Sequence, residues 1–281
     1  MYRDETAETA ETAETAETAE TAETAETTET TETTETAGAA ETGVAQAQAV
    51  VGGTDLGHLL VSLQLTDSAF PSGFYTLSHG LEGFAQQGAV GPDSLAALLH
   101  DVLRHGVGPA DATALALAHR AAAAGDWDAV TATDRRLYAT KLGRETRQAA
   151  TRTGRQLLDL AAEVFGAPGV VRHHREVTAR RAPGTQAVAA GVVYAATGVP
   201  VRQAVAADLF AFCASFAGAA LRLRLTDHRL AQRLLRQAAP VIEETTHEAL
   251  ARGLDDLGAT TFAVDVMSAR HERAEARLFA S

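Results

Sequence analysis

The stretch LQLTDSAFPSG, residues 63–73, with SHGLE at residues 78–82, predicts two helices joined by a turn. The first residues continue an apolar helix, the proline and glycine interrupt it, and a new helix begins shortly after them. We expect Gly73 to adopt a backbone conformation that is costly for other residues. Glu82 is expected to reach a cation or a helix end.

Apolar residues recur at helical spacing through the rest of the chain, and no convincing period-two alternation appears, so a sheet is not expected. Residues 45–281 are therefore expected to form a single all-α domain, a bundle of about eight or more helices. Expected helices cover residues 110–124, 142–165, 186–196, 201–224 and 227–252. Apolar stripes within residues 56–63 and 95–103 predict two ordinary amphipathic helices, and a further helix is expected to begin after Asp126. Asp93 and Asp126 are predicted to cap the helices that follow them. Gly106 and the Gly108-Pro109 pair are predicted to end the helix before them, and residues 170–183 are predicted to form a loop.

The N-terminal residues 1–44 contain repeated Glu-Thr-Ala and Glu-Thr-Thr triplets and offer no large apolar face to bury, so this tail is expected to be disordered. Residues 1–43 carry thirteen acidic side chains and one arginine, which accounts for the whole net charge of −12. The remaining chain is formally neutral, which disfavours a nucleic-acid surface.

Sequence motifs for catalysis are missing. The chain has no phosphate-binding loop, zinc-protease motif, nucleophile elbow or Cys-x-x-Cys pair. We therefore predict no catalytic residue, cofactor or metal site, and interpret His173-His174 as part of a solvated polar loop. The single cysteine, Cys213, and the lack of a signal-peptide layout predict a cytoplasmic protein, and the apolar run around residues 204–221 is expected to be a central buried helix rather than a membrane span.

The turn region resembles the UreF family of urease accessory proteins, whose pattern L-Q-L-x-D-S-A-x-P-x-G-G-F-S-H-S-x-G-L-E aligns with residues 63–82. Phe74 and Leu77 depart from it, and His79 lies two places after the family histidine. The matching turn-motif residues that we single out, together with His79, are Asp67, Ser68, Pro71, Gly73, His79, Gly80 and Glu82. Arg144-Glu145, the helix end at residues 220–225 and the C-terminal segment are also similar to family regions, although Thr226 departs from the pattern.

The resemblance implies a non-enzymatic maturation factor that forms a homodimer and binds UreD, also called UreH. Through that complex it would recruit the GTPase UreG for nickel insertion into apo-urease. The C-terminal segment, residues 265–281, is expected to be the most exposed recognition element. Its predicted partner-binding residues, with two from an earlier helix, are Arg270, His271, Glu272, Arg277, Leu278, Phe279, Arg144 and Glu145. Truncation after Val264 is then expected to leave a folded chain.

Three alternatives remain open from the sequence. The terminal helix can instead dock on its own bundle. The protein can be an all-α enzyme or ligand-binding bundle with a pocket near Asp67, His79 and Glu82. A helical regulator of an unrelated GTPase is also compatible with the composition.

Overall fold

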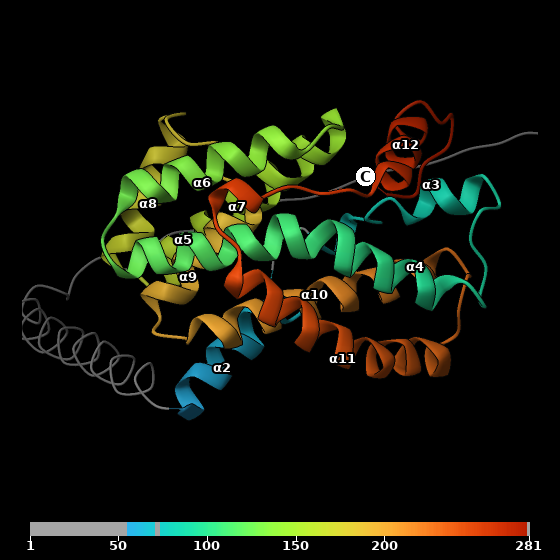
Figure 1. The fold of residues 1–281 in the computed structure, drawn as a ribbon, viewed down its shortest axis with the longest axis horizontal. Coiled ribbons are helices and arrows are strands. Elements are labelled where there is room, and N and C mark those ends of the chain that lie inside the picture. Colours follow the sequence, from blue (N-terminus) through green and yellow to red (C-terminus); the bar gives the residue numbers. More distant parts are fainter. Residues whose placement is uncertain (1–54, 71–73, 280–281) are drawn as a thin grey trace, which may run out of the picture. The chain divides into compact units, whose positions relative to one another are not determined.

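The computed structural model describes residues 55–70 and 74–279, and every regular element in this part of the chain is helical, as predicted (Figure 1). The first elements are α2 (Asp55–Thr66), η1 (Phe74–Thr76), α3 (Leu81–Gln86), α4 (Leu95–Val102), η2 (Leu103–Ala112), α5 (Thr113–Ala123) and α6 (Trp127–Thr140). They are followed by α7 (Arg144–Val164), α8 (Pro168–Thr178), α9 (Gln186–Ala196), α10 (Val201–Arg222), α11 (His228–Ala251), η3 (Leu254–Asp256) and α12 (Phe262–His271). Pro71 and Gly73 lie outside the described residues.

Helix α9 forms the centre of the core. All residues from Ala187 to Tyr194 are buried, and the helix packs against α5, α7 and α8. A Cβ atom at Gly191 would lie 2.6 Å from the Leu115 carbonyl oxygen, so glycine lets α9 approach α5 closely. Small residues thus allow a dense helical core with few aromatic side chains.

The buried carboxylate of Asp134, on α6, fixes the start of α9. Its oxygens accept hydrogen bonds from the Gly184 and Thr185 backbone amides at 2.7 and 2.9 Å and from the Thr185 hydroxyl at 2.5 Å. These amides belong to Thr185, the N-cap residue of α9, and to the residue before it. A side chain from another helix therefore holds the turn that leads into α9, which the sequence alone did not indicate.

The predicted helix end between Gly106 and Pro109 is wrong. Helices α4 and α5 are joined by η2, a π-helical stretch that contains Pro109. Proline lacks an N–H group, and a wider helical turn accommodates its ring without ending the helix. The Thr113 hydroxyl donates a 3.0 Å hydrogen bond to the Gly108 carbonyl, which satisfies an acceptor inside this turn.

The predicted loop at residues 170–183 is also wrong over most of its length, because α8 occupies its first part. Val170, His173 and Val177 are buried on one face of that helix, with a spacing of three and four residues. His173 therefore lies in the core and not in a solvated polar loop. The surrounding arginines concealed this narrow buried stripe.

Helix starts follow the predictions in part. Asp126 caps α6 by accepting from the Ala129 amide at 3.0 Å, as predicted. Asp93 does not cap α4: the residue before that helix is Ser94, whose hydroxyl bonds to the Gly91 backbone. Both residues precede the same helix, and residue preference alone did not distinguish them.

Within the described residues, α10 is the one helix long and apolar enough to cross a membrane by composition. Half of its most apolar window is buried, and it packs against α2, α5, α9 and α11. These contacts are those of a core helix, as predicted, although Phe210 stays exposed.

Candidate functional site

The C-terminal segment is bound to the start of α3 through Glu82, which is buried. Glu82 Oε2 accepts a 2.7 Å hydrogen bond from His271 Nε2 and a 3.0 Å bond from the Phe279 amide. Its other oxygen accepts a 2.7 Å bond from the Leu278 amide. One carboxylate thus holds the end of α12 and the residues after it, although they follow Glu82 by almost two hundred positions. Figure 1 shows α12 beside α3.

A second layer of charged residues joins the same segment to the start of α7. Arg277 pairs with Glu145, and Arg144 pairs with Glu272. The Nδ1 atom of His271 lies 3.6 Å from Glu145 Oε2, so the imidazole sits between two carboxylates. All these contacts are internal to the chain.

The C-terminal segment is therefore docked on its own bundle. Phe279 is buried with the Arg222 guanidinium 4.3 Å from its ring centroid, and His271 is buried between α3 and α7. The expectation of an exposed segment is wrong for these two residues. Leu278, in contrast, is 62% exposed, and Arg270 is exposed.

The turn motif before α3 places its residues in different surroundings. Asp67 accepts a 2.6 Å hydrogen bond from the Ala69 amide and exposes its side chain, and Ser68 is exposed beside it. His79 and Gly80 have left-handed backbone angles, with φ of 55° and 84°. A Cβ atom at Gly80 would also lie 3.1 Å from Val264 Cγ1 on α12, so this glycine allows the close approach of the C-terminal helix.

His79 packs against the core and forms its hydrogen bond with an uncharged side chain. Its Nε2 atom lies 2.9 Å from the Ser215 hydroxyl, which itself donates to the Phe74 carbonyl at 3.1 Å. Because that hydroxyl has one proton, His79 Nε2 is the donor in the first bond. Burial, assisted by the charges of Lys141 and Arg222, lowers the pKa of His79 to about 3 and keeps the ring neutral at physiological pH.

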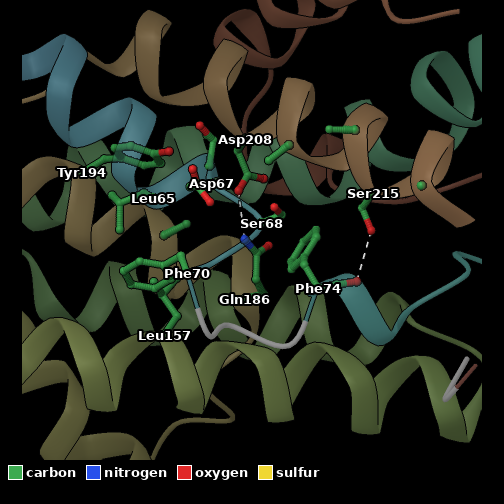
Figure 2. A pocket seen from close by; sticks show the side chains of 15 residues that line it. Leu65, Asp67, Ser68, Phe70, Phe74, Leu157, Gln186, Tyr194, Asp208 and Ser215 are labelled. Atoms are coloured by element: carbon green, nitrogen blue, oxygen red, sulfur yellow. Dashed lines mark hydrogen bonds between the residues drawn. The ribbon is translucent and has the colours of Figure 1, made fainter. Parts of the chain in front are cut away.

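Two cavities share Phe74, Gln186 and Asp208 in their walls. The first has a volume of about 350 Å³ and is lined by residues of α2, α7, α9 and α10 (Figure 2). The second, of about 460 Å³, lies between η2, α7, α10 and α12. Asp67 lines the first cavity, His79 the second and Glu82 neither. The single pocket expected near these three residues is therefore not formed.

Asp208 is the functional candidate that the sequence did not reveal, since it appeared there only as an interruption of an apolar run. Its Oδ1 atom accepts a 2.8 Å hydrogen bond from Gln186 Nε2. Burial raises the pKa of Asp208 to about 6; the Gln186 hydrogen bond opposes this shift and the Asp111 charge adds to it. An acid with a perturbed pKa in a cavity is typical of a binding or catalytic position.

We expect Asp208→Asn to stabilise the fold more at pH 8 than at pH 5. The folded pKa exceeds the usual value of 3.8, so ionisation disfavours folding; this cost is absent well below pH 4, grows towards pH 6 and is complete above it. The full cost corresponds to about 3 kcal/mol in the free energy of unfolding, of which about 1.4 kcal/mol arises between pH 5 and pH 8. Urea denaturation of the variant and wild type at both pH values measures it, with exposed Asp255→Asn as control. An equal effect at both pH values would contradict the assignment.

Residues 55–70 and 74–279 contain no group of three or more His, Cys, Asp or Glu side chains placed to hold a metal ion.

Comparison with known proteins identifies the family. The UreF family model matches residues 90–239. A urease accessory protein UreF from Trichodesmium erythraeum (strain IMS101) is 30% identical over 229 residues, which cover 81% of this chain and 99% of the relative. The UreF protein of Methylobacterium sp. (strain 4-46) is 36% identical over 225 residues, covering 79% and 88%. The resemblance predicted from the turn and C-terminal motifs is thus confirmed, and the chain belongs to the UreF family of urease accessory proteins.

Proposed function

We propose that the protein is a non-catalytic scaffold for urease maturation in the cytoplasm. It binds UreD (UreH) and, through that complex, recruits the GTPase UreG so that nickel is inserted into apo-urease. Family membership supports this role, as does the lack of a catalytic motif in the sequence. The observation that supports it most directly is the composition of the outer surface of the docked C-terminal segment.

We define the C-terminal surface as Phe262, Val266, Arg270 and Leu278. The first three are exposed on α12 at intervals of four residues and so share one face of the helix. Phe262 is 67% exposed, and Leu278 lies on the segment that Glu82 holds. Exposed aromatic and aliphatic side chains beside an arginine are typical of the centre of a protein interface. This composition supports UreD binding at the C-terminal surface.

The arrangement also gives the buried residues of the segment a role. Glu82 and His271 hold the backbone on which Leu278 is presented, and the pairs of Arg144 and Glu145 hold its flanks. We infer that these residues position the surface for UreD and do not themselves touch it.

Leu278→Asp combined with Phe262→Asp is expected to lower the yield of co-purified UreD at least tenfold. The chain itself should stay folded. Both side chains are exposed, so a carboxylate there costs little in the free chain but is desolvated in an apolar interface. Val164→Asp, at the far end of α7, is the matched control, because helix geometry places it about 28 Å along α7 from Glu145. Retained UreD binding by the double variant would move the interface elsewhere.

The homodimer is proposed on a different surface, formed by α2. Leu56, Leu59, Leu60 and Leu63 are 47–64% exposed and follow a spacing of three and four residues. The sequence predicts an ordinary amphipathic helix here, whereas in the structure these leucines face outward. α2 packs on α10, where the exposed Phe210 lies two turns after Gln203, which bonds to Ser62 on α2. An uncharged leucine ridge is self-complementary and suits packing against a second copy across a twofold axis.

Leu60→Glu is expected to convert the dimer into a monomer, since two glutamates would face each other across the twofold axis. Light scattering coupled to size exclusion measures the mass, and Val164→Glu, on another exposed surface, is the control. A wild-type monomer, or a variant that remains dimeric, would refute the proposed surface.

A further inference from the structure

The polar side chains that line the first cavity present mainly hydrogen-bond acceptors. Among the described residues, its polar lining consists of two carboxylates, Asp67 and Asp208, the amide of Gln186 and the hydroxyls of Thr66, Ser68 and Ser215, with no lysine, arginine or histidine. The Thr66 and Ser215 hydroxyls already donate to backbone carbonyls. Figure 2 shows Asp67, Asp208 and Gln186 gathered around one space, with the amide of Gln186 bonded to Asp208. The cavity therefore offers mainly acceptor oxygens and negative charge.

Tyr194 is a second, independent sign of a ligand. Its side chain is only 2% exposed, it lines the cavity, and its hydroxyl has no hydrogen-bond partner among the residues that the structure describes. Because the hydroxyl opens into the cavity, a group bound there can supply its hydrogen-bond partner. Burial and the nearby charge of Asp208 raise the pKa of Tyr194, so the phenol stays protonated and keeps its oxygen lone pairs available.

The remaining walls favour an organic cation. Phe70 and Phe74 line the cavity together with the aromatic ring of Tyr194. Aromatic faces attract cations, and this attraction increases when the cation loses its water shell. A divalent metal would instead need several oxygens converging at short distance. Two carboxylates and three rings spread around a cavity of about 350 Å³ suit a flat or tetrahedral group that is larger than a metal ion.

We propose that this cavity binds a guanidinium or ammonium group. Asp208 supplies the opposite charge, Tyr194 and the Gln186 carbonyl oxygen accept hydrogen bonds, and the rings of Phe70 and Phe74 cover the apolar part of the ligand. Two kinds of ligand carry such a cationic group: a small free cation, and an arginine or lysine side chain of a partner protein. The proposal does not rest on the scaffold function.

The test uses the full chain and n-butylguanidinium as the probe, titrated calorimetrically at pH 8 and pH 5. We expect saturable binding of one probe per chain at pH 8, about tenfold weaker at pH 5, where Asp208 is largely protonated. Asp208→Asn should weaken binding at pH 8 at least tenfold and Tyr194→Phe several-fold. Exposed Asp255→Asn should leave it unchanged, and the neutral isostere n-butylurea should bind at least tenfold more weakly.

Three results would overturn the proposal: no saturable binding to folded wild-type protein, equal affinity in Asp208→Asn, or displacement of the probe by one equivalent of nickel. Thermal unfolding of each variant verifies that it is folded. A competition arm separates the two sources. Release of bound UreD by the probe assigns the group to a partner side chain, and an unaffected complex assigns it to a free small molecule.

Discussion

Glu82→Ala is expected to lower the free energy of unfolding by about 4 kcal/mol, because each buried or partly buried hydrogen-bond donor left without its acceptor costs about 1–3 kcal/mol. The change leaves His271 Nε2 and the amides of Leu278 and Phe279 without their acceptor. Denaturant unfolding followed by circular dichroism gives the difference.

The control is Glu275→Ala, which removes an exposed carboxylate from the same C-terminal segment and should change the unfolding free energy by less than about 0.5 kcal/mol. Equal effects of the two substitutions would show that Glu82 has no special role. The same contacts reverse the expectation for truncation after Val264: the shortened chain loses His271 and Phe279 from its interior, and we now expect it to be strongly destabilised.

Gly154→Ala is expected to destabilise the fold by about 3 kcal/mol or more, through overpacking against backbone that cannot move. A Cβ atom at this position of α7 would lie 2.2 Å from the Gly184 carbonyl oxygen and 2.7 Å from the Thr185 carbonyl carbon. Asp134 holds that turn from the other side by three hydrogen bonds, so the turn cannot withdraw without breaking them. Thermal unfolding or the soluble yield of the variant measures the effect.

Gly218→Ala on α10 is the matched control, because its added Cβ atom meets no other atom within 4 Å. In a helix interior this change is expected to stabilise by about 0.5–1 kcal/mol through reduced freedom of the unfolded chain. A Gly154→Ala variant as stable as Gly218→Ala would mean that α7 and α9 are farther apart than described.

The sequence predicted the fold class because periodic apolar residues determine which segments become helices. The predicted helix at residues 186–196 has the observed bounds, and those of α7, α10 and α11 differ by two residues or fewer at either end. The prediction failed where local signals compete with packing. Pro109 is accommodated by a wider turn, and in α8 a buried stripe of only Val170, His173 and Val177 is surrounded by charge.

The site was predicted less well, because it depends on contacts between distant positions. Glu82 and His271 were both singled out, yet nothing in the sequence indicates that one accepts a hydrogen bond from the other. Asp208 carries no motif, and only the cavity around it shows that it is unusual. The outward orientation of the α2 leucines likewise follows from packing on α10 and not from their spacing.

Hydrogen exchange of the isolated full chain tests most directly whether the C-terminal segment is docked before a partner arrives. The Leu278 and Phe279 amides, both bonded to Glu82, are expected to exchange at least a hundredfold more slowly than unstructured chain. Glu82→Gln, which keeps the side-chain shape but loses one acceptor oxygen, should abolish much of this protection. Exchange of both amides at the unstructured rate in the folded wild type would contradict the account.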